Sequence, residues 1–125
     1  MRVYLDNAAT TPIAPEVTKA ITEVLENDFG NPSSTHSYGR HVKAHIENSR
    51  RNIAKHINCS PSEIVFTSGG TEADNMALTS SICNLGIKRI ITSSIEHHAV
   101  GHTVKFLYDQ GRVQLDIVNV DKKDM

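Results

Sequence analysis

The sequence predicts an α/β fold with a largely parallel sheet and flanking helices. From residue 64 onward, short apolar stretches of strand length alternate with amphipathic stretches of helix length, in the order β-α-β-α-β. Strands joined through a helix pair in parallel by right-handed crossovers. The 125 residues are 38% hydrophobic and 22% charged, as in ordinary folded domains. Because so small a sheet would keep an open edge, we also expect the fold to be incomplete in this chain.

The first half is predicted to be an arm followed by two helices. Residues 1–14 are expected to form an extended N-terminal arm, and residues 15–125 the domain itself. Pro15 suits the first turn of a helix that ends before Gly30. A second helix is predicted over residues 37–56, and its expected buried stripe consists of Val42, Ile46, Ile53 and Ile57.

Local signals place the later elements as well. Ser60-Pro61-Ser62-Glu63 has the form of a capping box and predicts a short helical turn. The apolar residues 64–67 are typical of a strand buried on both faces. Thr71 is expected to cap a helix over residues 72–81, with Asp74 completing the box. The remaining predicted elements are a strand at 89–93, a helix at 99–108 and a strand at 113–120.

Charge and composition exclude several classes of function. The 13 basic and 14 acidic residues are interspersed and give a net charge of −1, so no nucleic-acid partner is expected. No apolar run is long enough to span a bilayer, and the N-terminus lacks a hydrophobic signal core. Cys59 and Cys83 are too few for a disulfide framework and are interpreted as small, semi-buried residues. A cytoplasmic protein without a membrane segment is expected.

The turn Ser68-Gly69-Gly70-Thr71 is a candidate phosphate site. It would lead from a strand into the N-terminus of a helix, where free N–H groups and the helix dipole favour an anion. Glycines allow close approach to the backbone, and the Thr71 hydroxyl adds a donor. A Walker loop is excluded because its lysine is missing. The alternative is a tight, capped turn that binds nothing.

His97 is a second candidate. Ligands of open α/β sheets bind at the carboxyl ends of strands, so His97 is expected on the same rim as Thr71. An imidazole there could lie flat against an aromatic cofactor and exchange protons near neutral pH. The alternative is a helix-start residue that faces water.

His98 and His102 suggest a competing hypothesis. Their spacing would let both reach one metal ion, with Glu96 or His97 as a third ligand. The HExxH arrangement is absent, since Ala99 follows His98. A solvated, histidine-rich turn is therefore favoured, and no metal site is predicted.

Taken together, these segments resemble the cysteine desulfurases of the class-V aminotransferase group. The matching stretches follow the family's order and spacing, and they are YLDNAATT at 4–11, FGNPSS at 29–34, EIVFTSGGTEADN at 63–75 and EHHAV at 96–100. The resemblance implies the N-terminal portion of a large domain of pyridoxal-phosphate (PLP) fold type I. The form of the matching segments is closer to the housekeeping and nitrogen-fixation branch of the family than to the sulfur-mobilisation branch.

The resemblance also implies a cofactor and roles for particular residues. Gly70 and Thr71 match the positions that bind the phosphate of PLP. His97 matches the catalytic histidine that stacks on the PLP ring and assists proton transfer. Asn7 and His36 fall in segments near the active site of such enzymes, without a defined role.

The implied reaction converts L-cysteine to L-alanine and leaves the sulfur as a persulfide on an enzyme cysteine, for iron–sulfur cluster assembly. The implied partners are a second copy, as a homodimer, and a sulfur-acceptor or iron–sulfur scaffold protein. The family's Schiff-base lysine and sulfur-accepting cysteine correspond to positions beyond Met125, so a fragment is expected. The alternatives are a non-catalytic truncated subunit and a small metal- or phosphate-binding module.

Overall fold

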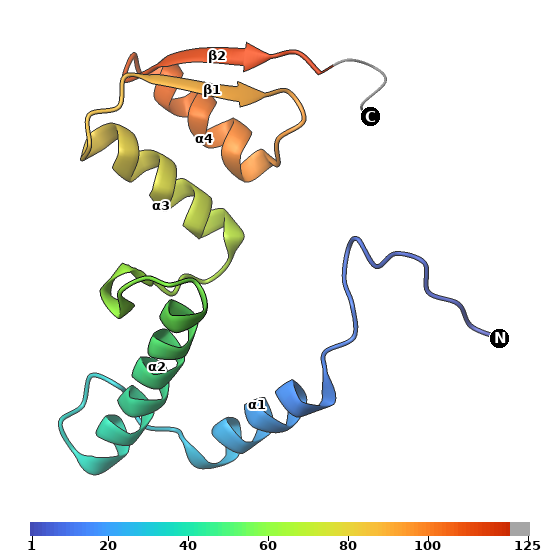
Figure 1. Cartoon of the computed structure of the whole chain (residues 1–125), viewed down its shortest axis with the longest axis vertical. Coiled ribbons are helices and arrows are strands. Elements are labelled where there is room, and N and C mark those ends of the chain that lie inside the picture. Colours follow the sequence, from blue (N-terminus) through green and yellow to red (C-terminus); the bar gives the residue numbers. More distant parts are fainter. Residues whose placement is uncertain (121–125) are drawn as a thin grey trace. The chain divides into compact units, whose positions relative to one another are not determined.

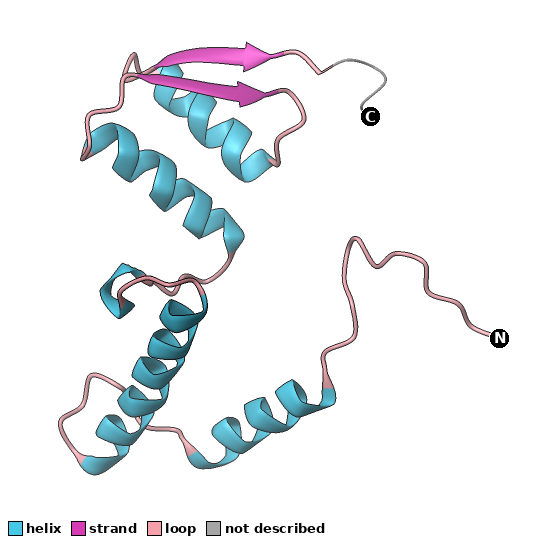
Figure 2. Ribbon diagram, in the orientation of Figure 1, coloured by secondary structure: helices cyan, strands magenta, loops and turns pink. Residues whose placement is uncertain are grey.

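The computed structural model describes residues 1–120, which divide into two compact units at residues 64 and 65 (Figure 1). The first unit contains the helices α1 (Pro15–Asn27) and α2 (Ser37–His56) and the 3₁₀ turn η1 (Pro61–Glu63). The second contains α3 (Gly70–Cys83), β1 (Arg89–Ser93), α4 (His98–Asp109) and β2 (Gln114–Val118) (Figure 2). The predicted α/β class is confirmed.

Both helices of the first unit confirm the prediction. Pro15 occupies the first turn of α1, and α2 has the expected bounds. The capping box before η1 is also confirmed, because the Ser60 hydroxyl accepts from the Ser62 N–H (3.4 Å) and the Glu63 carboxylate accepts from the Ser60 N–H (2.7 Å). Residues 1–14 form neither helix nor strand and turn at Asp6, whose carbonyl accepts from the Ala9 N–H. The arm-and-domain boundary at residue 14 stays a prediction.

The buried stripe predicted for α2 is wrong over its second half. Val42 and Ile46 are half-buried, but Ile53 is 40% and Ile57 62% exposed. Within this unit α2 packs chiefly against η1, which is too short to cover a stripe of this length. Periodicity shows which side of a helix is apolar, but another element must pack on that side to bury it.

The loop between α1 and α2 packs tightly against the first turn of α2. A Cβ atom at Gly30 would lie 2.5 Å from the Tyr38 carbonyl oxygen, and one at Gly39 would lie 2.5 Å from the carbonyl oxygens of Asn31 and Ser34. The Asn31 side chain accepts from the Ser33 N–H (2.9 Å). Backbone-to-backbone contact therefore fixes the loop against the helix, and glycine is required at both crossing points.

We expect Gly39→Ala to destabilise the protein by about 1–3 kcal/mol, because the added methyl group would overlap backbone atoms that cannot turn away. Denaturant unfolding measures the change. Gly101→Ala is the matched control, since a Cβ atom at this position in α4 meets nothing within 4 Å. It should be neutral or stabilising, because alanine favours helices. Equal destabilisation by both substitutions would contradict the close approach.

The second unit is a two-stranded parallel sheet with helices. β1 and β2 pair in parallel from Arg89–Gln114 to Ser93–Val118, with α4 as their connection (Figure 1). α3 packs against α4. The core consists of Ile82, Leu107 and Val113, with Ile90 packed against it. The predicted strands at 89–93 and 113–120 and the helix between them are confirmed, with ends that differ by two residues or fewer.

The strand predicted at residues 64–67 is wrong. These residues form no strand, and Val65 and Phe66 are 60% and 47% exposed. The sheet in the described part of the chain consists of β1 and β2. A strand needs a neighbour for its N–H and C=O groups, and a local apolar run does not provide one.

Cys83 also departs from expectation, because it is exposed, whereas Cys59 is half-buried and both thiols are free.

Candidate functional site

The N-terminus of α3 is built differently from the prediction. The helix begins at Gly70 and Gly69 is its N-cap, so Thr71 is not the cap and makes no box with Asp74. Instead, the Glu72 carboxylate accepts from the Ser68 N–H (2.7 Å) and the Ser68 hydroxyl (2.8 Å). These two hydrogen bonds, that from the backbone first, lower the pKa of Glu72. Glycine at the cap position supplies no side-chain oxygen, so the acid of the first turn reaches back to the preceding loop.

This arrangement leaves hydrogen-bond donors available. The first backbone bond into the helix runs from the Ala73 N–H to the Gly69 carbonyl, so the N–H groups of Gly70 and Thr71 have no partner inside the helix. Among residues 1–120, no group hydrogen-bonds to the Thr71 hydroxyl. A Cβ atom at Gly69 or Gly70 would meet nothing within 4 Å. The backbone here is open to a ligand from outside.

His97 is the N-cap of α4. Its Nδ1 atom accepts from the Ala99 N–H (3.1 Å), which orients the ring at the point where the chain leaves β1 and enters the helix. Because Nδ1 accepts this bond, the proton of the neutral imidazole lies on Nε2. The cap thus provides an exposed ring in a fixed orientation, with Nε2 available to donate or exchange a proton.

The structure brings Thr71 and His97 to one depression of about 340 Å³ within the second unit. This volume lies at the small end of the range for ligand sites, about 300–1,000 Å³. Gly70 precedes Thr71 as the first residue of α3 but does not line the depression. The lining residues are Thr71, Asn75, His97, His98, Ala99, His102 and Thr103.

Asn75 and Thr103 join the two walls of this depression, and neither residue was predicted to have a role there. Asn75 lies one helical turn after Thr71, and its amide donates to the Thr71 carbonyl (2.6 Å). The Thr103 hydroxyl, on α4, hydrogen-bonds to the Asn75 side-chain oxygen. The spacing of Asn75 from Thr71 in the sequence indicates that the two residues share a helix face. Nothing in the sequence indicates the hydrogen bond between Asn75 and Thr103, because it joins separate helices.

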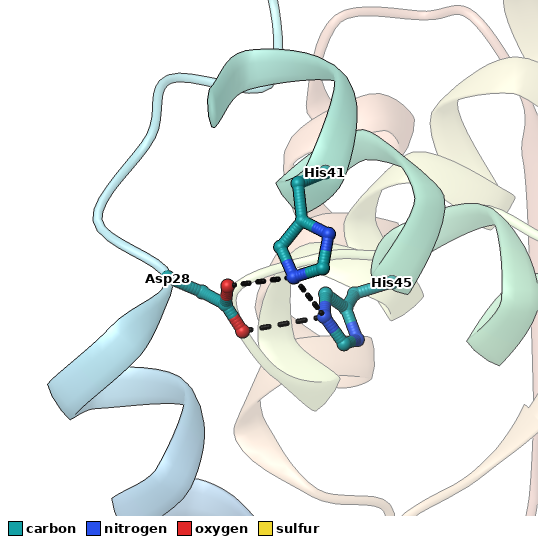
Figure 3. A group of neighbouring side chains, drawn as sticks. All are labelled: Asp28, His41 and His45. Carbon is teal, nitrogen blue, oxygen red and sulfur yellow. Dashed lines mark hydrogen bonds and ion pairs between the residues drawn. The ribbon is translucent and has the colours of Figure 1, made fainter. Parts of the chain in front are cut away.

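The histidines of α4 do not form a three-ligand metal cluster. The rings of His98 and His102 lie 5.1 Å apart, but across residues 1–120 the group with metal-ligand geometry is Asp28, His41 and His45, in the first unit (Figure 3). The spacing of His41 and His45 was visible in the sequence, whereas Asp28 had no sequence signal that linked it to them.

None of the described helices is long and apolar enough to cross a membrane.

Comparisons with known proteins agree with the architecture. Residues 3–125 match the family model described as aminotransferase class-V. A cysteine desulfurase IscS of Dictyoglomus turgidum is 46% identical over 97% of this chain, and a selenocysteine lyase of Xenopus tropicalis is 39% identical over 95%. The chain spans 31% of the length of each of these two relatives.

Solved structures agree as well. A NifS-like protein superposes with a TM-score of 0.84 at 38% identity, over 94% of this chain and 33% of that protein. A structure described as SspA in complex with cysteine matches with a TM-score of 0.80 at 34% identity, over 94% of this chain and 33% of its own. The chain is therefore a member of the class-V aminotransferase family and corresponds to about the first third of its cysteine desulfurase-like relatives.

Proposed function

We propose that the full-length protein is a PLP-dependent cysteine desulfurase that converts L-cysteine to L-alanine and retains the sulfur as a persulfide on one of its cysteines. The observation that carries the proposal is the depression that Thr71 and His97 share, at the N-termini of two helices. The similarity to a cysteine desulfurase IscS and to a protein solved with cysteine supports the choice of substrate.

The N-terminus of α3 is suited to the phosphate of PLP. A phosphate carries negative charge and several acceptor oxygens, so it complements unpaired N–H groups and the positive end of a helix dipole. The N–H groups of Gly70 and Thr71 and the Thr71 hydroxyl are such donors. Glycine at position 70 lets an anion approach the backbone, since no side chain covers it. We assign Gly70 and Thr71 to phosphate binding on these grounds.

His97 is suited to the catalytic role. PLP, when bound, supplies the electron sink that this chemistry needs. The His97 ring is held by the Ala99 N–H at Nδ1, so one face can lie against a planar cofactor. Its Nε2 atom can hold a proton or transfer one to a neighbouring group.

Other features of the proposal rest on the resemblance and on composition. The lysine that binds PLP and the cysteine that accepts sulfur would belong to the remainder of the full-length protein. We further propose a homodimer in the cytoplasm that passes sulfur to an acceptor or iron–sulfur scaffold protein. The net charge of −1 gives no reason to expect a nucleic-acid partner.

The direct test incubates the full-length protein, loaded with PLP, with L-cysteine and a thiol reductant. We expect L-alanine and sulfide in equal amounts, and neither product without PLP. L-selenocysteine is the matched second substrate, because one relative is named a selenocysteine lyase. Turnover of selenocysteine alone would replace the proposed substrate. PLP binding without turnover of either amino acid would favour the non-catalytic alternative.

A further inference from the structure

Three side chains of the first unit converge on one point beside the end of α1. Asp28 directly follows α1, and His41 and His45 lie one turn apart on α2 (Figure 3). The Nε2 atom of His41 lies 3.1 Å from Oδ1 of Asp28, and the Nε2 atom of His45 lies 3.2 Å from Oδ2. The two Nε2 atoms lie 3.3 Å apart.

In the absence of a cation, hydrogen bonds account for two sides of this triangle. Each contact with the carboxylate needs a hydrogen on the Nε2 atom of that histidine. When both Nε2 atoms carry a hydrogen, the two nitrogens are only in van der Waals contact and share no proton. A cation that accepts electron pairs from all three groups satisfies every contact at once.

The three distances, 3.1, 3.2 and 3.3 Å, are close to those between ligand atoms around a tetrahedral metal ion. Zinc binds imidazole nitrogen and carboxylate oxygen at about 2.0–2.2 Å, which places neighbouring ligand atoms of a tetrahedron about 3.3–3.6 Å apart. We propose that Asp28, His41 and His45 form a binding site for a divalent transition-metal cation, with zinc as the best match. Imidazole and carboxylate ligands suit zinc, and three protein ligands leave a fourth position for water or an exogenous ligand.

The surrounding structure holds the site in place. Asp28 caps α1 through its N–H, which donates to the Val24 carbonyl (2.8 Å), and its side chain is only 10% exposed. The close backbone contacts of Gly30 and Gly39 fix the loop that places Asp28 opposite α2. The histidine side chains are 66% and 50% exposed, so an ion can reach them from solvent. A bound ion would cross-link the end of α1 to α2.

The site is independent of the proposed enzyme activity, since it shares no residue with the depression around Thr71 and His97. Its test uses the full-length protein after treatment with a chelator, titrated with zinc in a calorimeter. We expect one zinc per chain at this site and a rise in melting temperature on binding. His41→Ala/His45→Ala should weaken this binding by at least about 100-fold, because loss of an outer-shell partner alone costs about 10–100-fold.

Two further variants make the test specific. Asp28→Asn keeps the shape of the side chain but removes its charge, and it should also weaken zinc binding. His98→Ala/His102→Ala removes a pair with the same helical spacing and should leave this binding unchanged. Circular dichroism checks that every variant is folded. With Co²⁺ in place of zinc, the intense visible absorption of tetrahedral cobalt should appear in the parent and in the His98/His102 variant, and disappear in the other two.

Zinc binding that persists in folded Asp28→Asn and His41→Ala/His45→Ala proteins would overturn the proposal, as would a parent protein that binds no zinc. Loss of binding with the His98/His102 pair instead would move the metal to α4. Normal desulfurase activity alongside any of these results would leave the proposed function intact. The proposed metal site and the proposed function can therefore fail separately.

Discussion

Replacing His97 with alanine in the full-length protein is expected to lower the rate of L-alanine formation from L-cysteine by about 10²–10⁴-fold, the usual contribution of a positioned acid–base group. PLP should still bind, because the phosphate donors lie on α3 and the His97 side chain is not among them. Turnover at saturating PLP gives the rate, and the absorbance of the protein-bound cofactor gives its content.

The structure supplies a control that separates catalysis from folding. His97 is also the N-cap of α4, and loss of a cap costs roughly 0.5–2 kcal/mol of stability. His97→Asn keeps a side-chain acceptor for the Ala99 N–H but removes the imidazole, so it should preserve stability and still lose the rate. His98→Ala, a neighbour in the same depression, should have a small effect. Normal turnover of His97→Asn would remove the catalytic role from His97.

Replacing Thr71 with valine is expected to weaken PLP binding by about 10- to 150-fold. Valine has nearly the shape of threonine but no hydroxyl, so one hydrogen bond to a charged phosphate is lost, which corresponds to about 1.5–3 kcal/mol. Titration of PLP-depleted full-length protein measures the dissociation constant. Thr71→Ser retains the hydroxyl and should bind PLP nearly as well as the parent.

Thr71→Val and His97→Ala should differ in whether added PLP restores turnover. At saturating PLP, Thr71→Val should recover most of its turnover, whereas His97→Ala should not. If Thr71→Val binds PLP as tightly as the parent, the phosphate lies elsewhere, and the interpretation of the N-terminus of α3 fails. That result would leave His97 as a separate question, because its evidence is the cap geometry of α4.

Signals that act over a few residues were read correctly from the sequence. The bounds of α2, the capping box at Ser60 and the strand β1 depend on propensity, caps and turn residues that lie close together in the chain. The cap of α3 also depends on neighbouring residues, but its prediction was wrong. Threonine is a good cap residue, but the helix begins at Gly70, two residues earlier than the predicted cap at Thr71 allowed.

Contacts between residues far apart in the sequence could not be predicted from such local features. The apolar run at 64–67 has every local feature of a buried strand, but it forms none in the described chain, because pairing depends on which backbone lies beside it. The bond between Asn75 and Thr103 likewise needs α3 and α4 to pack at a particular register.

By itself, the sequence determined the fold class, most of the element boundaries and the residues, Gly70, Thr71 and His97, that match the motifs of the family. These follow from local chemistry and from motif order along the chain. Only the tertiary structure decided that Thr71 and His97 line one depression, and that Asp28 meets His41 and His45. The physical reason is that such sites depend on side-chain directions and close backbone contacts, as at Gly30 and Gly39, which arise when separate elements pack.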